Sequence, residues 1–276
     1  GGSFDSAVTM SNNLTVSGDL ASSTSGTSNF RAGVNAGNSI ASGGNYNTVV
    51  GDEAGTALST GDNNIAMGFE ALKTEDTGQN NVAIGYRAMK VANYDGAGNN
   101  VAVGADAGLS MTTGIYNTFV GAFAGDAHTQ GYNNVAIGTN ALGSDVSSRA
   151  TVAIGSGALE IQNTTDTDAY NTAVGFSAGA KVTSGIKNVI MGSLAGDEIT
   201  TGQQNVCIGY NSSANLTTGN FNVCIGSINK PSSANGEFVI VLGYNVSGAN
   251  NYTTIGKSSS DIRALHGSTT WSTVSD

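Results

Sequence analysis

The sequence has little charge and almost no proline, and each shortage excludes a class of protein. Charged residues make up only 11% of the 276 residues, against 39% hydrophobic residues, which is unlike a disordered chain rich in charge. A single proline beside 40 glycines excludes a collagen-like chain, because collagen needs abundant proline and a glycine at every third position. The chain can therefore bury a core, but one made mainly of small side chains.

Basic residues and long apolar runs are also scarce. The chain has 20 acidic residues against 10 lysines and arginines, a formal charge of −10, and its basic residues form no stripe. Nucleic acid is therefore not an expected partner, because neutralising phosphates requires clustered positive charge. No apolar run approaches the roughly 18 residues that cross a bilayer, so no membrane insertion is expected.

One short sequence motif recurs along most of the chain. A typical copy is Asn81-Val82-Ala83-Ile84-Gly85, followed by a second alanine and a polar run that ends in Thr-Thr-Gly or a variant. Most closing glycines are 17 residues apart, with longer units near residues 90–98 and 162–170, and a degenerate earlier copy closes at Gly33. A fixed short period indicates a solenoid. The closing glycines are Gly51, Gly68, Gly85, Gly104, Gly121, Gly138, Gly155, Gly175, Gly192, Gly209, Gly226, Gly243 and Gly256.

The repeat predicts an all-β parallel roll of about 13 coils. Frequent glycine, β-branched apolar residues and a unit too short for two helices exclude a helical repeat. The apolar tetrad is predicted to be a short strand, and the alanine three residues after the glycine, such as Ala54 or Ala88, is predicted to begin a second, weaker one. The Thr-Thr-Gly segment is predicted to form the turn that leads back to the next strand. Stacking at about 4.8 Å per coil gives a rod roughly 60 Å long.

Alternation along the strand predicts which residues face the interior. The residues three and one before the glycine are predicted to point into the roll, and the residue between them to point outward. Because the middle residue is apolar too, we expect a second chain to cover it; the alternative is a monomer with an unusual apolar stripe. The interior set includes Val82, Ile84, Gly85, Val135, Ile137, Gly138, Val206, Ile208 and Gly209, and the seam set includes Ala83, Ala102, Ala136, Ala153, Cys207 and Cys224.

Asparagine and cysteine also recur in register. An asparagine opens most strands, as at Asn81 and Asn134, and is predicted to form a structural ladder in which its amide bonds backbone groups. Cys207 and Cys224 lie one coil apart, so a disulfide is conceivable, but packed reduced thiols are favoured because other coils hold small apolar residues there. Two cysteines alone do not make a zinc site, and no metal or cofactor is expected.

The repeat resembles the repeats of two groups of proteins. The Asn-Asn-Val-Ala-Ile-Gly core with its trailing alanine and Thr-Thr-Gly turn is similar to the head repeats of YadA-type trimeric autotransporter adhesins, and to the repeat tracts of phage tail fibres. The resemblance covers about residues 30–256 and implies a left-handed parallel β-roll of three chains around one axis. The unit is longer than the usual adhesin repeat, and no heptad stalk or membrane anchor follows it.

The two ends favour the phage fibre. Residues 10–20 resemble the short β segments that link fibre modules, and residues 258–276 look like the junction before a self-cleaving chaperone domain that guides trimerisation, ending at Ser275-Asp276. The resulting division is a linker at 1–29, the repeat domain at 30–256 and a tip at 257–276. The implied location is the virion, and the alternative is a bacterial cell surface.

Few residues are candidates for catalysis. Asp166 and Asp168 in the longest insertion, and Asp52 with Glu53, invite comparison with the paired carboxylates of polysaccharide-cleaving spikes. No companion residues are predicted to bury them, so solvated charge is the favoured interpretation, and the sequence predicts a protein that is not an enzyme.

Aromatic residues offer candidate contacts for a host glycan or protein receptor. Tyr94, Tyr116, Tyr132 and Tyr170 lie in insertions and turns, where they would stack on sugars or cap the coils. The C-terminal group Arg263, His266 and Trp271 breaks the repeat and would serve as a receptor contact or as a cap for the last coil. The sequence thus predicts a host-attachment fibre, with an adhesin head and a polysaccharide-degrading spike as alternatives.

Overall fold

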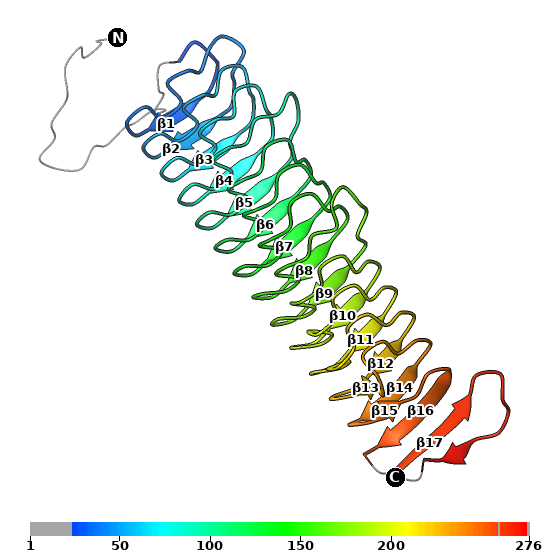
Figure 1. The fold of residues 1–276 in the computed structure, drawn as a ribbon. Helices are drawn as coiled ribbons and strands as arrows, with labels where there is room; N and C mark the ends of the chain where they lie inside the picture. Colours follow the sequence, from blue (N-terminus) through cyan, green and yellow to red (C-terminus); the bar gives the residue numbers. More distant parts are fainter. Residues whose placement is uncertain (1–23, 259, 275–276) are drawn as a thin grey trace, which may run out of the picture.

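The chain folds into a long β-solenoid with one short strand per coil (Figure 1). The structure is a computed structural model and describes residues 24–258 and 260–274, in which every named element is a strand. Segment 10–20 and the pair Ser275-Asp276, which suggested a fibre linker and a chaperone junction, lie outside these residues. The fold is therefore an all-β parallel solenoid of about 13 turns with a spacing near 17 residues.

Fourteen parallel strands stack in sequence order into one sheet. Each strand pairs with the next so that repeat positions match, as in Val82 with Val101 and Ala83 with Ala102. The sequence repeat is thus the structural repeat. The parallel strands are β1 (Phe30–Ala32), β2 (Thr48–Val50), β3 (Ile65–Met67), β4 (Val82–Ile84), β5 (Val101–Val103), β6 (Thr118–Val120), β7 (Val135–Ile137), β8 (Val152–Ile154), β9 (Thr172–Val174), β10 (Val189–Met191), β11 (Val206–Ile208), β12 (Val223–Ile225), β14 (Ile240–Tyr244) and β16 (Tyr252–Lys257).

The inside and the outside of the strands are the reverse of the prediction. The middle residue of each strand lies inside the coil: Ala83, Ala102, Ala136, Ala153, Cys207 and Cys224 are all fully buried within one chain. The flanking residues face outward and are half-buried or exposed, namely Val82, Ile84, Val135, Ile137, Val206 and Ile208. Alternation fixes that neighbours point to opposite sides, but not which side is the interior. Because the interior of the coil is narrow, it holds the middle residue of the strand, which is mostly small, and the larger flanking residues lie outside.

Two further columns complete the narrow interior. The residue three after the repeat glycine is an alanine in most coils and is buried there, and the residue seven after the glycine is buried in most coils too, as in Leu58, Met111 and Leu216. The predicted second strand at these alanines is wrong, because they lie in turns and the next residue has a left-handed backbone, as in Gly55 and Met89. Among the described residues, a second sheet forms in one place near the C-terminal end, where β13 (Lys230–Pro231) pairs with β15 (Ser247–Gly248).

The asparagine ladder is confirmed. The side-chain oxygen of Asn117 accepts the backbone N–H of Asn134 at 3.0 Å, and its amide nitrogen donates to the carbonyl of Gly131 at 2.9 Å. The same pair of contacts recurs at Asn188, which donates to Gly202 and accepts from Asn205. The amide satisfies backbone groups that turns would otherwise leave unpaired inside the coil.

The two ends of the stack differ. At the C-terminal end, β17 (Ser260–Leu265) turns back antiparallel on β16, and β18 (Ser272–Thr273) pairs antiparallel with β17 (Figure 1). At the other end, β1 pairs only with β2 among the described strands. An antiparallel hairpin thus covers the sheet edge at one end.

The repeat glycines are required by the stacking. Gly85 has φ of 136°, and a Cβ there would lie 2.6 Å from the carbonyl carbon of Gly104 in the next coil. A backbone contact of this kind cannot rotate away, so any side chain must separate two coils. The same geometry recurs at almost every coil, which explains why this column holds nothing but glycine.

We therefore predict that Gly85→Ala lowers the free energy of unfolding by at least about 2 kcal/mol, from backbone strain and from the clash with Gly104. Gly157→Asn is the matched control, because Asn140 and Ser177 occupy the same place in adjoining coils with φ of 56° and 51°. Thermal unfolding by circular dichroism measures both. Equal melting temperatures for Gly85→Ala and the unmodified protein would contradict the argument.

Candidate interaction surfaces

The outward face of the sheet is an apolar strip that runs along the rod. In β10, Val189 is 36% exposed and Met191 is 42% exposed, while Ile190 between them is fully buried. Met67, Ile137 and Ile225 are exposed to a similar degree on other strands. The strip thus consists of large side chains, and the alanines predicted to form a seam between chains lie beneath it.

Exposed aromatic residues border this strip. They recur in two positions: two residues before the strand, where the residue between is an asparagine or, after Phe238, Val239, and directly after the repeat glycine. Some stack on the next coil, with ring centroids of Phe221 and Phe238 5.0 Å apart and those of Phe69 and Tyr86 5.6 Å apart. The first group includes Tyr46, Tyr116, Tyr170, Phe221 and Phe238, and the second Phe69, Tyr86, Phe176, Tyr210 and Tyr244. Both borders extend the apolar surface.

The two cysteines are free and buried, and their positions pair in register between β11 and β12. Burial raises the pKa of the Cys224 thiol to about 11 and raises that of Cys207 further. Both are therefore neutral thiols at pH 7, and neither is accessible to a substrate. They fill the same column as the alanines, which fits a packing role.

The candidate carboxylates do not form a buried acid–base pair. Asp52 is exposed and Glu53 half-buried; the hydrogen bond from Asn35 lowers the pKa of Glu53, with a further contribution from Lys73 at 3.5 Å. Asp166 is exposed and lies 3.7 Å from Arg149, and Asp168 accepts the hydroxyl of Tyr170 at 2.9 Å. None of the four carboxylates has the buried setting that raises the pKa of a general acid.

Of the two roles expected for Tyr94, stacking on a sugar and capping a coil, burial of the side chain contradicts the first. Tyr94 is buried in the insertion near residues 90–98, and burial raises the pKa of its hydroxyl. Its backbone N–H donates to buried Glu75 at 3.3 Å, and Gly78 donates to the same carboxyl at 2.6 Å. Glu75 was missed, although it replaces the apolar residue expected seven places after Gly68. Desolvation raises the pKa of this carboxyl.

The C-terminal candidates lie on the covering hairpin and beyond it. The guanidinium of Arg263 on β17 lies over the ring of Tyr252 on β16, 5.2 Å from its centroid. His266 is exposed, and Trp271 is 48% exposed directly before β18. Arg263 thus braces the hairpin, whereas His266 and Trp271 present their side chains to solvent.

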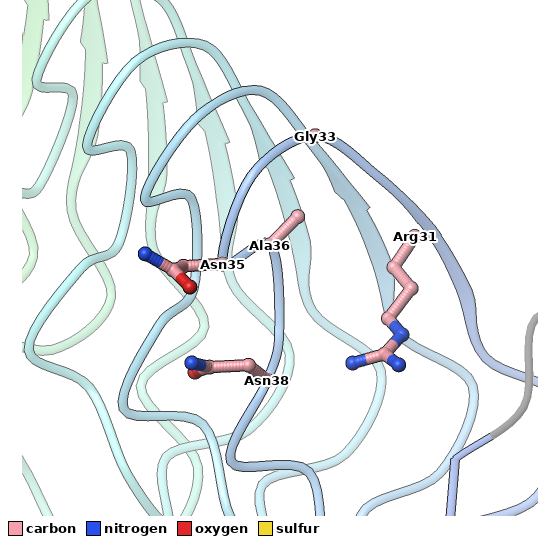
Figure 2. Close-up of a pocket in the computed structure, with 5 residues that line it drawn as sticks. All are labelled: Arg31, Gly33, Asn35, Ala36 and Asn38. Atoms are coloured by element: carbon pink, nitrogen blue, oxygen red, sulfur yellow. The ribbon is translucent and has the colours of Figure 1, made fainter. Parts of the chain in front are cut away.

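A polar hollow of about 300 Å³ lies at the N-terminal end of the described stack (Figure 2). Arg31, Asn35 and Asn38 line it together with Gly33 and Ala36. Arg31 pairs in register with Val49, so it occupies the interior column of the first coil, and its Nη1 donates to the carbonyl of Gly37 at 3.4 Å. The arginine closes the apolar column with a polar end.

A buried polar network interrupts the interior between β6 and β9. His128 Nδ1 lies 2.7 Å from Asp145 Oδ2, Ser148 donates its hydroxyl to the other oxygen of Asp145, and Gln162 donates to Ser148 at 3.0 Å. Serine and histidine both contact the carboxylate, whereas a hydrolytic triad needs serine next to histidine. Since all are buried, the network is structural.

Sequence reasoning missed this network, although a signal was present. His128, Asp145 and Gln162 each stand seven residues after a repeat glycine, where other coils carry Leu58, Met111 or Leu216. Nearby Thr151 replaces the ladder asparagine, and Gln162 donates to its hydroxyl at 3.1 Å and accepts from Asn171 at 2.7 Å. Gln162 thereby bridges the gap in the ladder.

Comparison with known proteins adds no assignment: no protein-family model, curated protein or solved structure matches the chain. Within residues 24–258 and 260–274, no group of three or more His, Cys, Asp or Glu side chains is arranged to hold a metal ion. The same residues contain no helix of the length and apolarity that a membrane span needs.

We predict that Asp145→Val lowers the free energy of unfolding by about 3 kcal/mol, because it leaves the buried His128 and Ser148 without their acceptor. The double variant His128→Leu with Asp145→Val should recover at least half of this loss, since the same column accepts Leu58 and Val182 elsewhere. Denaturant unfolding measures both. A double variant no more stable than Asp145→Val alone would contradict this account.

Proposed function

We propose that the chain is the shaft and host-attachment part of a phage tail fibre, a non-enzymatic homotrimer of left-handed coils. The observation that carries the proposal is the apolar strip of outward Val, Ile and Met side chains along the whole sheet. Parallel sheets are normally covered on both faces. Within one chain, the described residues cover the inner face of the sheet and leave the outer face half-buried or exposed.

The size of the strip supports a covering by other copies of the chain. Fourteen parallel strands spaced by about 4.8 Å, most of them three residues long, give a strip on the order of 600 Å² before the aromatic border that follows the repeat glycine is added. The largest apolar patch on a typical monomer is about 300–600 Å², and a stable interface takes about 800 Å² from each partner. A straight strip of constant width suits identical rods lying side by side.

Three chains and the attachment role come from the resemblance of the repeat to adhesin heads and fibre tracts. Either group would use such a rod to hold a binding end away from its base, on a virion for the fibre or on a bacterial surface for the adhesin. Glu53 and Asp166 contact cations and Asp168 accepts a tyrosine hydroxyl, and this supports a binding protein over a polysaccharide-degrading spike.

We predict that the unmodified protein sediments as three times the 27.5 kDa of one chain. Val189→Glu with Met191→Glu places two charges on the strip, so it should give folded single chains because a buried interface does not tolerate unpaired carboxylates. Sedimentation gives the mass and circular dichroism the fold.

Ile190→Glu is the matched control on the same strand. Its side chain is fully buried inside the coil, so this change should unfold the coil as well as the assembly. A folded, unmodified protein that sediments at the mass of a single chain would overturn the trimer.

A second prediction concerns attachment by the tip. Trp271 is 48% exposed, so Trp271→Ala should leave the melting temperature within about 1 °C while lowering attachment to host cells. Attachment of labelled protein to candidate host cells measures the effect. Unchanged attachment together with a lowered melting temperature would assign Trp271 to capping of the last coil instead.

A further inference from the structure

We propose that the long insertion before β9 forms a binding site for neutral oligosaccharides on the side of the rod. The coil from Gly155 to Gly175 is three residues longer than the usual 17. The extra residues bring five side chains from three consecutive coils together, here named the insertion site: Tyr132, Arg149, Asp166, Asp168 and Tyr170. This inference rests on the proposed attachment function and names a ligand for it.

The side chains of the insertion site are already linked to one another. The guanidinium of Arg149 lies over the ring of Tyr132, 4.9 Å from its centroid, and its Nη2 lies 3.7 Å from Asp166. The hydroxyl of Tyr170 donates to Asp168 at 2.9 Å. These contacts hold the rings and carboxylates in place, so binding costs little side-chain entropy.

The backbone of the insertion is also tied down. Ala169 donates to the carbonyl of Arg149 at 2.9 Å, and Arg149 donates to the carbonyl of Thr167 at 3.1 Å. The N–H of Asp166 donates to the hydroxyl of Ser147 at 3.0 Å. Thr165 and Asp166 have φ of 35° and 52°, so the loop turns sharply and presents Asp166 outward. The insertion is therefore a fixed surface feature.

The chemistry of the site suits a neutral sugar chain. Tyr170 is 54% exposed and Tyr132 is 36% exposed, and such rings offer apolar faces for the C–H side of a pyranose. The two carboxylates offer acceptors for sugar hydroxyls, while Arg149 already faces Asp166, so the site carries excess negative charge and disfavours acidic sugars. Tyr132 and Tyr170 are two coils apart, roughly 10 Å, which suits a short oligosaccharide.

A printed array of neutral and acidic oligosaccharides tests the site with the full chain. We expect binding to neutral glycans, and at least a tenfold weaker signal for Tyr170→Ala and for Asp166→Asn. Tyr46→Ala is the matched control, because Tyr46 also stands directly before a ladder asparagine and is 61% exposed, but its coil has no such insertion. Its binding should be unchanged.

Three results would overturn the inference: binding confined to acidic glycans, no glycan binding at all, or equal losses for Tyr46→Ala and Tyr170→Ala. Sedimentation of Tyr170→Ala is measured in parallel, and loss of the trimer would place Tyr170 in the interface between chains instead. If the unmodified protein is trimeric and attaches to cells while Tyr170→Ala binds normally, this site fails and the proposed function stands. If the unmodified protein is monomeric and does not attach to cells, the proposed function itself is wrong.

Discussion

The stacking of each coil on the next is the constraint from which the other features follow. Every coil gives its backbone N–H groups to carbonyls of a neighbouring coil, in turns as well as strands, for example Gly85 to Met67 and Val82 to Asn100. The coils must then stay a constant short distance apart. Glycine is required where two backbones meet face to face, and asparagine where a turn leaves backbone groups unpaired. The glycine and asparagine positions therefore vary less from repeat to repeat than the apolar positions do.

This explains which parts of the fold the sequence could predict. The glycine spacing fixed the period, and the tetrad before each glycine fixed the place of the strands. The asparagine ladder followed because an amide in register can satisfy the next coil. Inside and outside could not be assigned from alternation, because both Val82 and Ala83 are apolar. The deciding quantity is the width of the coil, which depends on left-handed turn residues such as Met89 that the pattern did not reveal.

Polar replacements in the interior escaped prediction for a related reason. Glu75, His128, Asp145 and Gln162 occur where the column of large apolar residues should continue, but a single polar residue in a turn-rich repeat resembles surface variation. Only the neighbouring coil shows that each has a partner, as Asp145 has in His128. Tyr94 was misplaced in the same way: an aromatic residue in an insertion suggests exposure, yet here the longer loop folds over Glu75 and buries the ring.

The narrow interior also bears on what the outer surface is for. Because the middle strand position mostly takes alanine and cysteine, with Phe119 and Ile190 among the few large residues, one coil buries little apolar surface on its own. Most β-branched residues of the strands point outward instead, where an isolated chain gains least from them. In the proposed trimer, contact between the strips of several chains would add stability that the isolated chain lacks. The insertions interrupt neither the sheet nor the strip, since β8 and β9 pair in unbroken register across the longest of them. Added loops can therefore vary the side of the rod, and whatever it binds, without disturbing the stacking that holds it together.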